Sequence, residues 1–191
     1  MKKIILSSLA IGVLMLTSCG ETEVKYALNG EETSMNWTGK YVADGHTHTG
    51  TIDITEGSVV YKGEEFVSGE FTIDMKTIKA TDVDGEMKMK LEGHLNSADY
   101  FNTASNTKAT VVINEITDKG IKATIKLLGK ELKADMPVKI TKDEKGMTAK
   151  GKFEVDFAAL NLNGFKPMPG DPEVAHPDTK IAFDLNLVLK K

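Results

Sequence analysis

Hydrophobic and polar residues alternate along most of the chain after residue 33. In the segment 121–127 the odd-numbered residues are all apolar, whereas Lys122, Thr124 and Lys126 occupy the even positions. The segments 153–157 and 181–189 follow the same pattern. A side-chain period of two predicts β-strands with one dry face and one wet face, as in an antiparallel sheet.

Nine segments have this strand character. They are 33–41, 47–55, 58–62, 65–75, 108–117, 121–128, 132–141, 147–157 and 179–190. Glycine-containing turns at 118–120 and 143–146 separate neighbouring segments and are typical of hairpins. Eight or nine strands with short connections favour a closed barrel or a sandwich. We predict an all-β fold, a single antiparallel eight-stranded β-barrel.

One stretch between the fourth and fifth predicted strands breaks the alternation. Its apolar residues Met87, Leu91 and Leu95 are four positions apart, which is helical spacing. Either Asp82 or Asp84 can cap the start of such a helix. We therefore expect one short helix near residues 84–95, lying across one end of the barrel.

The first residues have the pattern of a signal peptide. Lys2 and Lys3 precede an apolar run, 4–16, that is too short to span a membrane. The run ends in Leu-Thr-Ser-Cys, which resembles a bacterial lipobox with Cys19 as the lipidated residue. The alternative is an ordinary secretory peptide with an incidental cysteine. Cys19 is the only cysteine, so an internal disulfide is excluded.

These signals divide the chain into three parts. We expect a lipoprotein signal peptide at 1–18, a lipidated N-terminus and tether at 19–32, and the barrel domain at 33–191. A multi-chain lipid on Cys19 would hold the protein stably to a membrane. The residue after Cys19 is not Asp, which resembles outer-membrane sorting, and the acidic residues that follow resemble a surface-export signal. We expect an outer-membrane lipoprotein, either periplasmic or surface-exposed.

Charge makes a nucleic-acid partner improbable. The chain has 24 basic residues against 28 acidic ones, and its lysines are scattered without a basic block. An exposed edge strand could support a homodimer.

The segment His94-Leu95-Asn96-Ser97-Ala98-Asp99-Tyr100-Phe101 resembles a motif of the YceI family. Members of that family are extracytoplasmic lipid-binding proteins with a lipocalin-like β-barrel. The segments 37–40, 45–52 and 69–75 agree with the family's N-terminal region and are closest to its variant in Bacteroidetes lipoproteins. The segment 121–132 departs from the family pattern, because it lacks the usual Thr-Lys-Pro end. The resemblance covers roughly residues 34–157.

The resemblance implies a long apolar pocket that binds a polyisoprenoid, an isoprenoid quinone or a fatty-acyl chain for carriage or storage. An eight-stranded barrel either holds one such ligand or is filled by its own side chains. The candidate pocket-lining residues are Trp37, Phe71, Ile73, Met75, Tyr100, Phe101, Ile125, Leu127, Phe153, Phe157, Phe183 and Leu185. The alternative interpretation of each is simple core. Tyr100 and Phe101 are expected to cover the mouth of the barrel.

Two other functions compete with lipid binding. The first is an envelope interaction or stress-response module with a filled barrel and no ligand. The second is metal or small-ligand handling through His46 and His48, which lie two apart and share a strand face, with Asp44 as the nearest further ligand. Exposed strand histidines are the commoner explanation, so no metal or other cofactor is predicted.

An enzyme is improbable, because no serine has the G-x-S-x-G context of an activated nucleophile. The loop 171–178 carries acids and a histidine, but it is typical of a rigid solvated connection.

Overall fold

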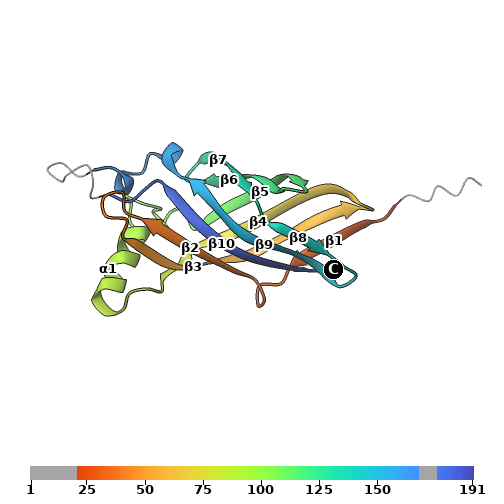
Figure 1. Ribbon diagram of the computed structural model, residues 1–191, viewed down its shortest axis with the longest axis horizontal. Helices are drawn as coiled ribbons and strands as arrows, with labels where there is room; N and C mark the ends of the chain where they lie inside the picture. Colours follow the sequence, from red (N-terminus) through yellow and green to blue (C-terminus); the bar gives the residue numbers. More distant parts are fainter. Residues whose placement is uncertain (1–20, 168–175) are drawn as a thin grey trace, which may run out of the picture.

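The described strands form one elongated antiparallel barrel (Figure 1). The computed structural model describes residues 21–167 and 176–191. Its strands are β1 (Glu23–Leu28), β2 (Ser34–Lys40), β3 (Thr47–Lys62), β4 (Glu65–Ala80), β5 (Lys108–Thr117), β6 (Gly120–Leu127), β7 (Lys130–Met136), β8 (Lys139–Lys142), β9 (Gly146–Asp156) and β10 (Lys180–Lys190). One α-helix, α1 (Gly85–Asn96), and two short 3₁₀ helices, η1 (Ala158–Leu160) and η2 (Asn163–Phe165), complete the described elements. The all-β barrel with one helix is thus confirmed.

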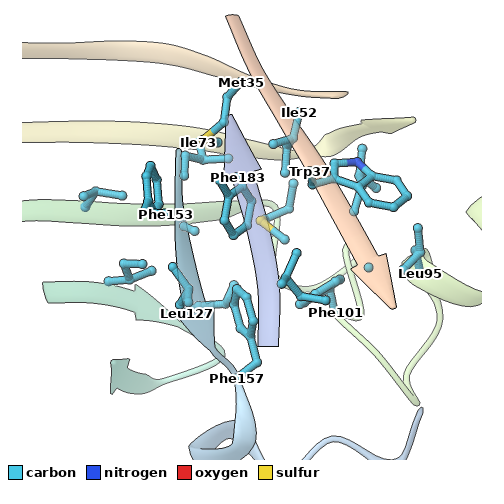
Figure 2. A pocket seen from close by; sticks show the side chains of 18 of the residues that line it. Met35, Trp37, Ile52, Ile73, Leu95, Phe101, Leu127, Phe153, Phe157 and Phe183 are labelled. Carbon is cyan, nitrogen blue, oxygen red and sulfur yellow. The ribbon is translucent and has the colours of Figure 1, made fainter. Parts of the chain in front are cut away.

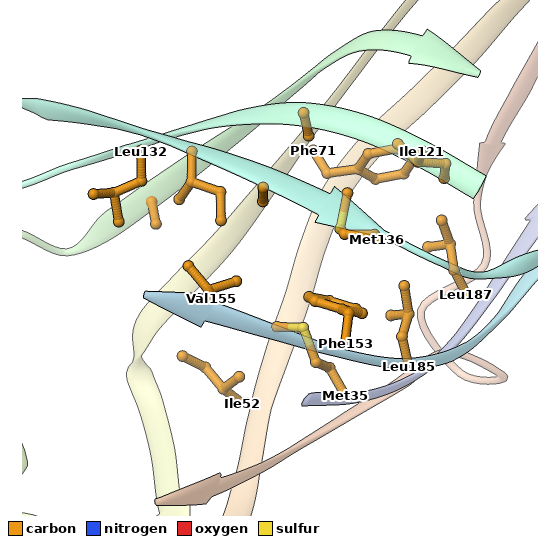
Figure 3. Close-up of a cluster of buried hydrophobic side chains, with 14 of the residues drawn as sticks. Met35, Ile52, Phe71, Ile121, Leu132, Met136, Phe153, Val155, Leu185 and Leu187 are labelled. Atoms are coloured by element: carbon orange, nitrogen blue, oxygen red, sulfur yellow. The ribbon is translucent and has the colours of Figure 1, made fainter. Parts of the chain in front are cut away.

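The strand order explains how the barrel closes. Neighbouring strands follow the order β7-β6-β5-β4-β3-β1-β10-β9-β8, and β2 pairs with both β10 and β3. The first strand of this path, β7, lies beside β9 (Figure 3). Within these described strands no backbone hydrogen bond joins β7 to β9. The wall therefore closes by side-chain packing at this seam.

Strand β3 runs without the predicted break at residue 57. The segments 47–55 and 58–62 form one strand, whose register against β4 shifts between Ile54 and Glu56, and Gly57 next to this shift has a φ of +153°. Gly57 pairs with Phe71 of β4, and a Cβ at position 57 would collide with the Phe71 ring. Glycine therefore lets the strand pass the ring, so the two predicted strands are one continuous, bulged strand.

Two further predictions of strand number were wrong. The segment 132–141 is split into β7 and β8, because Pro137 has no N–H to donate to a ladder. Residues 23–28, assigned to the tether, form strand β1, which pairs with β3 and β10. The barrel therefore has ten described strands rather than eight.

Helix α1 lies across one end of the barrel, as expected (Figure 1). Leu91 and Leu95 are half-buried, but Met87 is 63% exposed, so only part of the predicted apolar stripe packs. Asp84 occupies the N-cap position, although its side chain makes no capping bond within the described residues. Glu92 ties the helix to the end of β4 by accepting the Ala80 N–H at 3.0 Å.

The opposite end of the barrel is solid. Buried side chains of Tyr26, Val59, Tyr61, Met147 and Leu189 fill the interior there. Both chain ends of the described region lie at this end, as the pairing of β1 with the last residues of β10 requires (Figure 1). The barrel is therefore plugged at the end that carries the termini, away from α1.

Candidate functional site

The barrel encloses a cavity between the plug and helix α1 (Figure 2). Its volume is about 180 Å³. One ordered water needs only about 10–15 Å³ of such volume, so the cavity is far larger than a packing defect. The interior is hollow, which argues against the filled-barrel alternative.

All twelve candidate residues lie in the wall of this cavity. They are Trp37, Phe71, Ile73, Met75, Tyr100, Phe101, Ile125, Leu127, Phe153, Phe157, Phe183 and Leu185. Because β-strand side chains alternate, the inward faces of the strands supply nine of them. Phe157 lies between β9 and η1, and the segment after α1 supplies Tyr100 and Phe101. Their contact with a lipid stays a prediction.

Aromatic rings form a continuous band along one side of the cavity (Figure 2). The ring centroids of Phe101 and Phe157 are 6.0 Å apart, and those of Phe157 and Phe183 are 6.4 Å apart. Phe153 stacks on Phe183 at 5.6 Å. Such pairs add packing energy and fix the ring orientations, so the wall is shaped before any ligand binds.

Sequence reasoning missed several apolar lining residues. They include Met35, Ile52, Ile54, Ile78, Ala109, Val111, Ile113, Ile121, Met136, Val155, Ile181 and Leu187. Most continue the alternation on strands that were already predicted, as Met35 does two positions before Trp37. The alternation of apolar and polar residues along these strands could have identified these lining residues.

It also missed the polar lining residues. Lys40, Tyr41, His48 and His94 border the cavity at the α1 end. They come from the end of β2, the start of β3 and the last turn of α1. His48 was considered only as a metal ligand and His94 only as part of the family motif, because only the folded chain brings these three segments together.

Two loops that bind each other cover the mouth of the cavity. The first follows α1 and carries Asp99 and Tyr100, and the second follows β9 and carries Gly164 and Phe165. The Tyr100 hydroxyl donates to the Gly164 carbonyl at 2.9 Å, and the Gly164 N–H donates to the Asp99 carbonyl at 2.8 Å. The Tyr100 and Phe165 rings meet edge to face at 5.6 Å. Burial, with smaller contributions from Tyr41 and Asp99, raises the pKa of Tyr100 to about 12. Tyr100 is therefore a neutral hydrogen-bond donor at physiological pH.

Strand β7 fixes the second of these loops. The Lys130 ammonium donates to the carbonyls of Ala159 and Leu160 at 3.0 and 2.9 Å. These carbonyls belong to η1, so the lysine satisfies acceptors that the short helix leaves unpaired. The loop after β9 is thus held over the cavity from both sides.

His48 is held in one orientation at the rim. Its Nδ1 lies 2.8 Å from Asp82 Oδ2, and Asp82 Oδ1 accepts the Thr49 N–H at 3.0 Å. Burial alone would raise the pKa of Asp82, but these hydrogen bonds together outweigh it and lower the pKa. The ionised carboxylate can only accept, so Nδ1 of His48 carries the hydrogen and Nε2 is left for another partner. Asp82, a candidate helix cap, thus binds a histidine instead.

The metal hypothesis gains no support. The His46 and His48 rings are close, with centroids 4.7 Å apart. Asp44, the nearest proposed further ligand, accepts the His46 backbone N–H at 2.9 Å. The described parts of the chain hold no group of three or more His, Cys, Asp or Glu side chains placed to bind a metal ion.

Two observations concern the membrane. The predicted signal peptide and Cys19 lie outside the described residues. Among the described helices, none has the length and apolar character needed to cross a bilayer.

Comparisons with known proteins agree with this architecture. The YceI-like domain profile matches residues 26–187. The crystal structure of Burkholderia cenocepacia BcnA superposes with a TM-score of 0.59 at 14% identity, covering 84% of this chain and 98% of BcnA. A mutant CJ YceI protein with a monobromobimane guest covers 100% of both chains at 13% identity, with a TM-score of 0.45. Comparison with curated protein sequences finds no significant match.

The BcnA likeness supports the fold, and the profile match extends over most of the barrel, from β1 to β10. The chain therefore belongs to the family of proteins with a YceI-like domain.

Proposed function

We propose that this protein binds the apolar chain of one lipid inside its barrel and carries or stores it. The observation that supports this most directly is the hollow cavity, whose walls are apolar except at the α1 end. The family is a barrel family of binding proteins rather than of enzymes, which is consistent with a carrier.

The physics of the cavity favours a long hydrocarbon. Each methylene group moved from water into an apolar wall contributes about 0.8 kcal/mol, so a long chain gains affinity without specific polar contacts. A fatty-acyl chain, a polyisoprenoid or an isoprenoid quinone fits this requirement. The preformed aromatic band lowers the free-energy cost of ordering side chains when a ligand binds, because its rings already pack on one another.

We also propose that Cys19 is lipidated and anchors the protein to the outer membrane, on the periplasmic side or at the surface. Glu21, the first described residue, packs against the turn at Gly63, at the plugged end of the barrel. Glu21 is two positions from Cys19, a reach of about 7 Å at most. An anchor at Cys19 would thus keep the plugged end near the membrane and turn the mouth away from it.

Binding of retinol to the purified protein tests the carrier function. Retinol is an isoprenoid alcohol whose polyene accepts excitation energy from tryptophan. Trp37 is the only tryptophan in the chain and lies in the cavity wall. Bound retinol should quench Trp37 fluorescence with saturation at one equivalent.

A pair of variants makes this test specific. Val111 points into the cavity, and the next residue, Val112, points out of the same strand. Val111→Phe should weaken retinol binding at least tenfold by filling the cavity, whereas Val112→Phe should leave it unchanged. Equal retinol affinity in the two folded variants would contradict binding inside the barrel.

A further inference from the structure

The cavity ends abruptly on the side of the plug. On β3 the last lining residue in this direction is Ile54, and Val59, beyond Gly57, already belongs to the plug. On β4 the last lining residue in this direction is Phe71, which pairs with Gly57. The cavity therefore has a closed end at the level where Gly57 meets Phe71.

Five side chains form this closed end, which we call the floor. They are the lining residues nearest the plug on β4, β5, β6, β7 and β10, namely Phe71, Ile113, Ile121, Met136 and Leu187. Phe71 is the only aromatic residue among them, and its ring points from β4 toward Ile121 of β6 (Figure 3). The largest part of the floor is therefore a single side chain.

Two glycines make room for the floor. A Cβ at position 57 would collide with the Phe71 ring, and a Cβ at position 69 would lie within 3.3 Å of three atoms of the Ile113 side chain. Beneath the floor, the Tyr26 and Tyr61 rings pack edge to face with their centroids 6.1 Å apart. Because protein interiors are close-packed, this filled region gives the Phe71 ring little space to withdraw into.

The floor limits the length of hydrocarbon that the cavity holds. Phe71 and Ile78 are the first and last lining residues of β4, and seven positions along a strand extend at most about 23 Å. Methylene groups contribute to binding only where they leave water for the apolar wall. A chain that exceeds the distance from floor to mouth leaves its remaining methylene groups outside and gains nothing from them.

We propose that Phe71 determines the longest chain that the barrel binds along its full length. The ligand class is then a lipid with a single chain of acyl length, because a long polyisoprenoid would leave most of its length outside the cavity. This inference rests on the proposed lipid-binding function and adds the length of the ligand and the residue that sets it.

Displacement of bound retinol by saturated fatty acids tests the inference. The series runs from lauric to behenic acid in steps of two methylene groups. In the unmodified protein each step should tighten binding about tenfold until the chain reaches the floor. The next acid should bind no tighter than its shorter neighbour, which gives the series a break.

Three variants locate the residue responsible for the break. Phe71→Ala opens the floor, so the acid just past the break should bind about tenfold tighter relative to its shorter neighbour. Phe71→Leu preserves more of the packing and should shift the break in the same direction by less. Ile78→Ala enlarges the cavity at the other end of β4, where Glu92 of α1 contacts Ala80. It should weaken the acids to a similar extent and leave the break in place.

Saturable quenching of Trp37 by retinol reports that each variant has folded. Affinity that keeps rising through behenic acid in the unmodified protein would overturn the closed floor but leave lipid binding standing. A break that stays in place in folded Phe71→Ala and Phe71→Leu, or that moves as far in Ile78→Ala, would overturn the assignment of Phe71. Failure of retinol and of every acid to bind would overturn the carrier function, and the length limit with it.

Discussion

Trp37 is both a closely packed core residue and a part of the cavity wall. Its buried indole ring lies against Gly50 of the neighbouring strand, and its Nε1 donates to the Thr51 carbonyl at 3.2 Å. A Cβ at position 50 would collide with the indole ring and with the Lys79 carbonyl. Glycine at this position therefore allows tryptophan to form part of the wall.

Gly50→Ala should lower the free energy of unfolding by about 1–3 kcal/mol, because the ring or the strand must shift to admit the methyl group. Urea denaturation followed by Trp37 fluorescence measures this loss. Gly93→Ala is the matched control, since a methyl group at this position of α1 would point into open space, and alanine favours helix. An equal loss in both variants would contradict the close-packing argument.

Tyr100 should make stability depend on alkaline pH. Its pKa is about 12 in the folded protein and ordinarily about 10 in an unfolded chain. Between these values the unfolded chain releases the proton while the folded protein keeps it, so the contribution of Tyr100 to stability falls as pH rises.

The comparison with Tyr100→Phe isolates this effect. At pH 8 the variant should be about 1 kcal/mol less stable, because the hydrogen bond to Gly164 is lost. Urea denaturation at rising pH should show this advantage of the unmodified protein shrinking above about pH 10. An advantage that stays constant or grows would contradict the assignment.

At the scale of elements, alternation predicted most of the barrel. It located most of the strands after residue 33, but it could not decide what lies between them. Gly57 is equally consistent with a turn and with a continuous strand, and only its pairing with Phe71 shows that the strand continues. Strand β1 was missed although Val24, Tyr26 and Leu28 alternate with less apolar positions, because residues 19–32 were assigned to the tether.

The candidate site was also only partly predictable from the sequence. Its apolar wall follows from local period and from the family resemblance, so the twelve candidates all lie in the wall. Its polar rim depends on contacts between distant residues, such as His48 with Asp82, which are 34 positions apart. No sequence period contains that information.

The seam between β7 and β9 should be the least protected part of the wall. Seam-facing amides of these strands have no ladder partner there, whereas β6 is paired on both sides. Hydrogen exchange measured by NMR should therefore show at least about tenfold less protection for the seam-facing amides than for those of β6. Uniform protection across β6, β7 and β9 would contradict this description of the closure.

At the scale of the molecule, the first described residue, Glu21, lies at the plugged end, opposite the mouth. Strand β3 has 16 residues and extends about 50 Å from the mouth to the plugged end. A lipoprotein anchored through Cys19 should therefore present α1 far from its own membrane. Such a protein would exchange lipid with a partner or another surface rather than with the bilayer that holds it.

Fluorophores at the two ends test this orientation in vesicles. Cysteine is introduced as Met89→Cys in exposed α1 or as Glu144→Cys in the turn before β9. Quencher-bearing lipids should quench the dye at position 144 strongly and the dye at position 89 weakly. Cys19→Ala removes the proposed lipid attachment and should abolish both signals. Stronger quenching at position 89 would contradict the orientation.

The central claim is that the barrel holds one lipid in its cavity. Native mass spectrometry of the purified protein, before and after addition of oleic acid, tests it most directly. A barrel that holds one lipid should give a single adduct of lipid mass per chain, present in Val112→Phe and lost in Val111→Phe. Folded protein that forms no adduct, or forms it equally in both variants, would contradict the claim.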